Sequence, residues 1–297
     1  MKKAGLLVAL LCVLLPVAGQ NTAVYLQAGS PILEAAAAAI KASSPAAGLS
    51  APAGPVLLAA NKDRAVADLK DLKDKSVKYL YSVGTGPTVF ATQDPDFAGI
   101  YVFIPNPAGT GLLAHPKWSG VSPYPDPRLV MQYLRTSMGL QKVAVLYTRS
   151  KNQEVAKAFQ DAADSEKVAC VPLGFKEGDD LDQTLGAGLK DAQAVLLLID
   201  PLAFGADQVR FIVSKCLQAK KPVIGFLENL PEAGVPFAIF PPADEFGRTA
   251  AAAMKALQDK GEDRRIWYPQ RFVMSINQAA AQSLGVPYDS QKVVKAY

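Results

Sequence analysis

The clearest β-strand in the sequence is AVLLLI, residues 194–199, which is followed directly by Asp200 and Pro201. Six apolar residues without polar alternation are typical of a strand that is buried on both faces of a parallel sheet. A strand of the same kind, KVAVLY at 142–147, lies upstream, and a segment with apolar residues at helical spacing follows Asn152. Strands that alternate with helices in this way predict an α/β fold with helices on both faces of a parallel sheet.

The same alternation occurs twice along the chain. Before residue 110 we predict strands at 22–26, 55–60, 77–83 and 100–104, with helices at 31–42 and 63–73. After residue 140 we predict strands at 142–147, 168–173, 194–199 and 222–227, with helices at 152–163, 181–191 and 207–220. A helix at 243–260 and a strand at 272–276 complete the pattern. Two similar sets of units predict two Rossmann-like lobes with parallel sheets.

The length of 297 residues also favours two lobes, because it exceeds what one compact core usually takes. We expect residues 20–125 plus about 236–266 to form lobe 1, and residues 126–235 plus about 267–297 to form lobe 2. A chain that builds one lobe, then the other, and then returns must cross between them several times. These crossings predict a multi-strand hinge, and the facing strand ends predict a cleft that closes on a ligand.

The N-terminus predicts export from the cytoplasm. Lys2 and Lys3 precede an apolar run, and small residues follow at 17–19. This order is typical of a secretory signal peptide, so we expect residues 1–19 to be cleaved near Gly19 and the product to be periplasmic. The net charge is +4 with no long basic run, which argues against nucleic acid and anionic membrane as partners. A small solute or another protein remains as the partner.

Catalytic and covalent features are few. His115 is the only histidine, and no Ser-His-acid set, metal-ligand spacing or phosphate-binding loop accompanies it. We therefore expect neither an enzyme nor a bound metal or cofactor. Beyond the predicted signal peptide the cysteines are Cys170 and Cys216. They could pair in an oxidising compartment, but we favour two buried free thiols, since free Cys packs as a small hydrophobe.

An ordered set of short motifs resembles one family. The set comprises the segments GVS at 120–122, KVAVLY at 142–147, DP at 200–201, PVIG at 222–225, GRTAA at 247–251 and FVMSIN at 272–277. In this order and spacing, over roughly residues 77–290, the chain resembles the ABC-transporter substrate-binding proteins of the type I periplasmic-binding fold, in the branch that includes tryptophan-binding lipoproteins. Where that family usually carries Asp-Pro after its fourth strand, this chain has Asn106-Pro107.

The resemblance implies a function as well as a fold. It implies a monomeric solute-binding protein that captures a small organic ligand, with aromatic or apolar amino acids as the first class, for an ABC permease and ATPase. The alternative is a ligand-sensing or protein-interaction module of the cell envelope that is not coupled to transport. The shorter first lobe and the uncharged Asn106 favour that alternative.

The predicted ligand site consists of polar and aromatic residues at strand ends. In lobe 1, Thr85 lies in a predicted Gly-Thr-Gly turn, and Asn106 follows the fourth strand. Ser122 and Tyr124 flank the hinge, where Ser122 could cap the next helix or meet a ligand, and Tyr124 could stack on an apolar ring. In lobe 2 the predicted residues at strand ends are Tyr147, Ser150, Asp200 and Glu228. Asp200 is the favoured polar anchor, because the carboxyl ends of parallel strands face the ligand in open α/β sheets.

Overall fold

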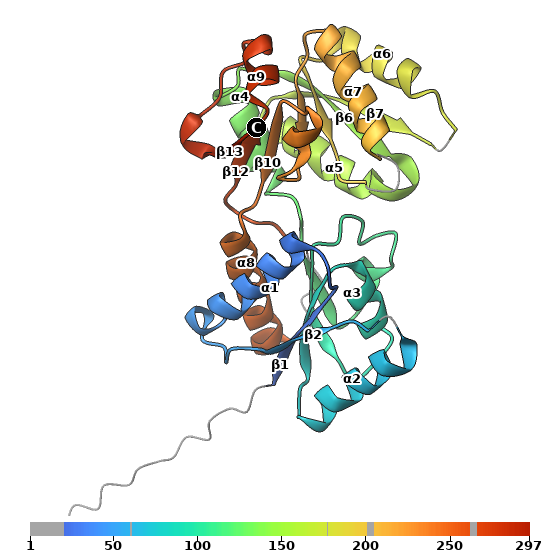
Figure 1. Ribbon diagram of the computed structural model, residues 1–297, viewed down its shortest axis with the longest axis vertical. Coiled ribbons are helices and arrows are strands. Elements are labelled where there is room, and N and C mark those ends of the chain that lie inside the picture. Colours follow the sequence, from blue (N-terminus) through green and yellow to red (C-terminus); the bar gives the residue numbers. More distant parts are fainter. Residues whose placement is uncertain (1–20, 60, 177, 201–204, 262–265) are drawn as a thin grey trace, which may run out of the picture.

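Two lobes stacked end to end make up the computed structural model, which describes residues 21–59, 61–176, 178–200, 205–261 and 266–297 (Figure 1). Each lobe has one sheet with helices on both faces, so the predicted α/β fold with two lobes is confirmed. The predicted signal segment and its cleavage position lie outside the described residues. Within those residues, no helix combines the length and the apolar character that crossing a membrane requires.

Lobe 1 contains six strands among the described residues, all parallel, in the order β11-β5-β4-β3-β1-β2. The strands are β1 Thr22–Leu26, β2 Ala53–Leu57, β3 Tyr79–Val83, β4 Ala98–Val102, β5 Trp118–Val121 and β11 Ile266–Trp267. One face of the sheet packs against α1 Pro31–Ser43 and α8 Ala243–Lys260. The other face packs against α2 Lys62–Asp74 and α3 Thr85–Ala91.

Lobe 2 contains seven strands in its described part, in the order β13-β12-β10-β9-β8-β6-β7. They are β6 Lys142–Thr148, β7 Ala169–Phe175, β8 Ala194–Leu197, β9 Val223–Gly225, β10 Phe237–Phe240, β12 Val273–Ile276 and β13 Val293–Ala296. All pairs are parallel except β10 with β12, which is antiparallel. The helices α4 Pro127–Thr136, α5 Arg149–Ser165 and α9 Gln278–Leu284 cover one face, and α6 Leu181–Asp191 and α7 Ala206–Gln218 cover the other.

The strand that fixed the fold prediction, β8, lies in the interior of the lobe 2 sheet. Leu196 packs in the core beneath α4 and α5, whereas Val195 and Leu197 pack in the core beneath α6 and α7. Both faces of the strand are therefore buried, which is why its sequence is continuously apolar rather than alternating. The described chain then crosses between the lobes three times, from β5 to α4, from β10 to α8 and from β11 to β12.

The structure differs from the sequence-based elements at several places, of which three bear on the lobes and the site. Residues 237–240 form β10 and pair with β9 and β12, so lobe 2 extends past the boundary expected near residue 236. The short strand β5 was not predicted, since its sequence WSGV has little apolar length. The predicted turn at 84–88 is the start of α3, because Gly84 takes φ 96° and ends β3, and the chain becomes helical from Thr85.

The packing of α8 on α1 depends on a glycine. A Cβ atom on Gly247 would lie 2.3 Å from the backbone oxygen of Ala39 and 2.8 Å from Ser43 Oγ, both on α1. The backbone of α1 cannot move away as a flexible side chain would, so the two helices can approach this closely only with glycine here. In contrast, a Cβ on Gly186 of α6 would meet nothing within 4 Å.

We therefore expect Gly247→Ala to lower the free energy of unfolding by about 1–3 kcal/mol, because the added methyl group overpacks the α1–α8 contact. The matched control is Gly186→Ala, which should be neutral or stabilise by about 0.5–1 kcal/mol, since alanine favours helix over glycine. Urea denaturation followed by circular dichroism measures both. Equal effects of the two substitutions would contradict the described packing of α8.

Both described cysteines are free, and they lie on opposite faces of the lobe 2 sheet. Cys170 on β7 packs against the core beneath α4 and α5, whereas Cys216 on α7 is fully buried in the core on the other side. Burial raises the pKa of each thiol to about 12, with a smaller contribution from Asp164 at Cys170. The structure therefore has two buried thiols in place of a disulfide.

This arrangement predicts slow thiol chemistry in the folded protein. With a pKa near 12, only about one thiol in ten thousand is a thiolate at pH 8, and reactivity rises as the pH approaches the pKa. In a chain that starts at Asn21, the two thiols should react slowly with an aromatic disulfide reagent while the protein is folded. In guanidinium without reductant, both thiols should react. If no thiol reacted after unfolding, the cysteines would be paired in a disulfide, contrary to the structure.

Candidate ligand-binding site

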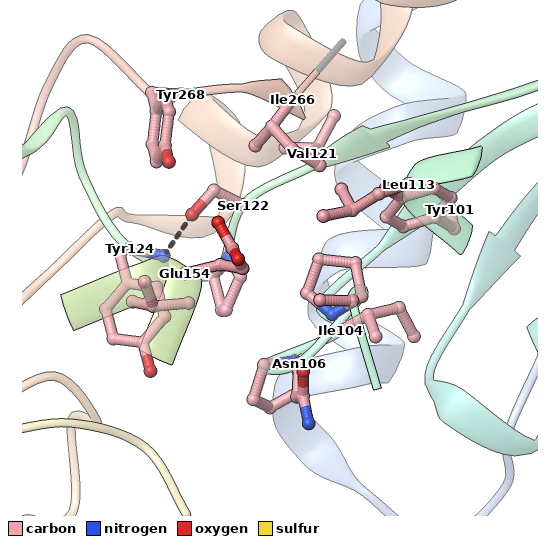
Figure 2. Close-up of a pocket in the computed structure, with 15 residues that line it drawn as sticks. Tyr101, Ile104, Asn106, Leu113, Val121, Ser122, Tyr124, Glu154, Ile266 and Tyr268 are labelled. Atoms are coloured by element: carbon pink, nitrogen blue, oxygen red, sulfur yellow. Dashed lines mark hydrogen bonds between the residues drawn. The ribbon is translucent and has the colours of Figure 1, made fainter. Parts of the chain in front are cut away.

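A cavity of about 200 Å³ lies between the lobes beside the first crossing (Figure 2). Its walls come from the ends of β4 and β5 in lobe 1, from the crossing segments, and from the start of α5 in lobe 2. The lining residues are Tyr101, Ile104, Pro105, Asn106, Pro107, Ala108, Leu113, Val121, Ser122, Pro123, Tyr124, Glu154, Val155, Ile266 and Tyr268. Most of these side chains are apolar or aromatic, as in small-molecule sites generally.

Tyr101 forms the lobe 1 wall of the cavity. It pairs in register with Gly120 on β5, and a Cβ on Gly120 would lie 2.1 Å from Tyr101 Cε2. The absence of a side chain at Gly120 therefore leaves the place that the tyrosine ring fills. Tyr101 is 2% exposed, and burial raises the pKa of its hydroxyl, with Tyr268 as a smaller cause. No hydrogen bond joins this hydroxyl to another described residue, so it remains available to a ligand.

Asn106 lines the cavity from the loop after β4. Its Oδ1 accepts a hydrogen bond from Gly109 N at 2.8 Å, which closes a turn within the loop. This is the common use of asparagine in turns. The amide nitrogen donates to no described residue, so Asn106 offers a donor to the cavity but no charge.

Ser122 and Tyr124 lie on the first crossing and also line the cavity. Ser122 Oγ accepts a hydrogen bond from Tyr124 N at 3.0 Å, and Ser122 N donates to Trp267 O at 2.9 Å (Figure 2). The predicted helix cap is a different residue, because Asp126 caps α4 through its contact with Arg128 N. Ser122 thus orders the crossing.

The Tyr124 ring belongs to the lobe 2 core. Its centroid lies 5.7 Å from that of Phe159 and 5.2 Å from that of Phe226, with edge-on geometry. The hydroxyl accepts a hydrogen bond from Ile199 N at 2.9 Å, and burial raises its pKa. The hydroxyl is therefore used in a hydrogen bond within the protein. The Tyr124 side chain forms part of the cavity wall and anchors the crossing in lobe 2.

The other predicted residues do not line this cavity. In lobe 1, Thr85 is exposed at the start of α3. In lobe 2, Tyr147 lies over Gly174 of the neighbouring strand, and Ser150 is exposed in the first turn of α5. The backbone of Glu228 accepts a hydrogen bond from Ser275 Oγ at 2.6 Å.

Asp200, the favoured anchor, is 6% exposed at the end of the β8 segment. Asn152 Nδ2 lies 3.5 Å from its Oδ2, and Lys151 Nζ lies 3.9 Å from its Oδ1. Asn152 also donates to Ile199 O at 3.2 Å and takes non-helical φ/ψ angles of −119° and 18°, so it marks a kink inside α5. Asp200 and Asn152 thus contact each other without being among the lining residues, and they fix the first turns of α5.

The structure adds three polar lining residues that the sequence analysis missed: Tyr101, Glu154 and Tyr268. Tyr101 resembles an ordinary core residue of a strand, and Tyr268 follows a strand of only two residues. Glu154 follows the α5 kink and lies on the exposed side of that helix. Burial raises the pKa of Tyr268, and nearby Asp126 adds to this effect. The described residues contain no cluster of metal-ligating side chains.

A family model for ABC transporter substrate-binding proteins matches residues 132–297, more than half of the chain. The protein belongs to this family. The predicted family is therefore confirmed, and so is the expectation that the protein is not an enzyme, because the family consists of solute-binding proteins. Its members bind a small molecule and work with an ABC transporter. No curated protein matches the sequence.

Solved structures with similar folds support the type I periplasmic-binding architecture of this substrate-binding protein. The ligand-free, open substrate-binding protein CD0873 of Clostridium difficile, which has adhesive properties, is 16% identical with a TM-score of 0.63, covering 93% of this chain and 100% of its own. An ABC domain from Streptococcus pneumoniae in complex with L-Trp is 15% identical with a TM-score of 0.56 and the same coverage. A ribose ABC transporter protein of Conexibacter woesei is 15% identical with a TM-score of 0.51, covering 90% of this chain and 95% of its own.

The different roles of two cavity tyrosines can be measured. Tyr124→Phe removes the acceptor of the buried Ile199 N–H and should lower the free energy of unfolding by about 1–3 kcal/mol. Tyr268→Phe removes a hydroxyl that makes no hydrogen bond to a described residue, so its effect should stay within about 0.5 kcal/mol. Chemical denaturation of both variants compares them. A Tyr268→Phe loss as large as that of Tyr124→Phe would contradict these assignments.

Proposed function

We propose that this substrate-binding protein captures a small organic ligand in the cavity between its lobes and delivers it to the permease and ATPase of an ABC importer. The observation that carries the proposal is the composition of the cavity wall, which joins residues of both lobes beside the crossings. A ligand that contacts both lobes favours the closed arrangement over the open one, and this difference is what a partner complex can recognise.

The lining supports a small ligand with an apolar ring or side chain. The cavity volume of about 200 Å³ lies below the range of roughly 300–1,000 Å³ that drug-sized ligands occupy. Aromatic and apolar amino acids are the first class to test, since the walls are aromatic and apolar and one structurally similar protein holds L-Trp. The protein acts outside the cytoplasm, as a monomer, after removal of residues 1–19.

A thermal-shift screen of the mature protein against amino acids, purines, peptides and small organic acids tests the proposal. A ligand at 100 times its dissociation constant adds about 2.7 kcal/mol of stability. For a chain of this size we expect the melting temperature to rise by roughly 5–10 °C. A flat result across the panel would overturn solute capture and favour the envelope sensing or interaction module.

A blocking variant identifies the cavity as the binding place. Ala108 is an exposed lining residue, so Ala108→Trp fills the cavity entrance without disturbing a core. We expect it to abolish the ligand-induced shift while the unliganded melting temperature stays within about 2 °C of the wild type. Ala38→Trp on the exposed side of α1 is the matched control and should keep the full shift. A full shift in Ala108→Trp would place the ligand elsewhere.

A further inference from the structure

We propose that the cavity selects ring-bearing ligands that carry a cationic amine and no carboxylate, and that Glu154 supplies the opposing charge from lobe 2. This inference rests on the proposed function and keeps its small ligand with an apolar ring, but it replaces the amino acids that are tested first with amines that lack the carboxylate. Three observations carry it: the charges that line the cavity, the position of Glu154, and the partners of the neighbouring cations.

The described lining residues of the cavity include one negatively charged side chain and no positively charged one. Of the described residues that form the cavity wall, Glu154 is the only one with a charged side chain. The polar groups beside it are uncharged: the hydroxyls of Tyr101, Ser122 and Tyr268 and the amide of Asn106. A carboxylate on the ligand would therefore enter a largely apolar cavity without a cationic partner, which is costly, and would also face the Glu154 carboxylate. An ammonium group would instead find a counter-charge and tyrosine rings, whose faces attract cations.

Glu154 is positioned by the kink in α5. Asn152 anchors the kink to the carbonyl of Ile199, and Ala156 and Phe159 fix the next turn in the lobe 2 core. Glu154 and Val155 then extend from lobe 2 to the cavity, where Figure 2 shows Glu154 beside Ser122 and Tyr124 of the first crossing, with the labelled lobe 1 residues on the other side of the view. No ion pair joins Glu154 to another described residue, so its carboxylate is available for a ligand.

The cations nearest in sequence have other partners. Arg149 Nε donates to Gly174 O at 2.8 Å, and Lys151 Nζ lies 3.9 Å from the Asp200 carboxylate. Lys157, one turn after Glu154, pairs with Asp161 at 2.8 Å. The start of α5 thus presents to lobe 1 a carboxylate whose charge no neighbouring cation cancels by direct contact.

Isothermal titration with a matched set of indoles tests the inference. The set comprises tryptamine with an amine only, L-tryptophan with both groups, indole-3-propionate with a carboxylate only, and indole with neither. We expect tryptamine to bind at least tenfold more tightly than L-tryptophan, because L-tryptophan must also bring a carboxylate into a cavity whose described lining has no cationic partner for it. Indole-3-propionate should bind most weakly, because it has the carboxylate and lacks the ammonium group, whose charge-assisted hydrogen bond is typically worth about a factor of ten or more. Added salt should weaken tryptamine binding but not indole binding.

Glu154→Gln keeps the side-chain shape and removes the charge. It should weaken tryptamine about tenfold or more and leave indole unchanged. Asp164→Asn removes an exposed carboxylate from the same helix, away from the cavity and outside any described ion pair, and should change neither affinity. Equal affinities for tryptamine and indole-3-propionate, or an unchanged tryptamine affinity in Glu154→Gln, would overturn the inference and leave the proposed function intact. If none of the four indoles binds but another compound of the thermal-shift panel does, the inference alone fails. If nothing binds in either experiment, the proposed function fails.

Discussion

The Glu245 carboxylate joins the segments on which the two-lobed structure depends. Glu245 lies in the first turn of α8, where the chain re-enters lobe 1, and is 7% exposed. It accepts a hydrogen bond from Gln270 N at 2.9 Å, and Arg248 Nη2 lies 2.5 Å away. Gln270 Nε2 donates in turn to Asp126 Oδ2 at 3.3 Å. All three described crossings are therefore linked, and a buried carboxylate with these charge-assisted bonds holds them in one geometry.

The lining residues on the linked crossings form one part of the cavity wall, and those at the start of α5 form another. Ser122, Tyr124 and Tyr268 lie on the crossings, and Ser122 N and Asp126 N donate to the backbone of Trp267 and Pro269, each at 2.9 Å. In the proposed closure these walls would keep their geometry, because they lie on the crossings that join the lobes. The start of α5 belongs to lobe 2 and not to the crossings, so the proposed closure would change its distance to lobe 1 more than it changes theirs. The proposed closure would therefore bring Glu154 and Val155 toward the apolar walls on lobe 1 and the crossings.

The sequence predicted the elements that have a clear local pattern of apolar residues. It did not predict the strands and lining residues whose positions depend on contacts between distant segments. The buried strands at 142–147 and 194–199 are long apolar runs and the helix at 243–260 has a helical period, and the structure has β6, β8 and α8 there. The strands β5 and β11 are too short to show a period, and they exist because they complete the lobe 1 sheet. Asn106 was placed at the cavity by topology alone. Tyr101 was not, because its role depends on its register with Gly120 on another strand.

In the proposed function the two lobes contribute different parts of ligand recognition. Lobe 1 and the crossings supply shape, through Tyr101, Leu113 and Ile266, and their polar groups are neutral. Lobe 2 supplies the charge through Glu154, while Asp200 is not among the lining residues and contacts Lys151 and Asn152. A ligand with an apolar ring and no cation can therefore bind against the lobe 1 walls without favouring the closed form, since it gains little additional contact with α5. A ligand with a cation gains its additional contact only when the lobes approach, and that difference in affinity between open and closed forms is what drives closure.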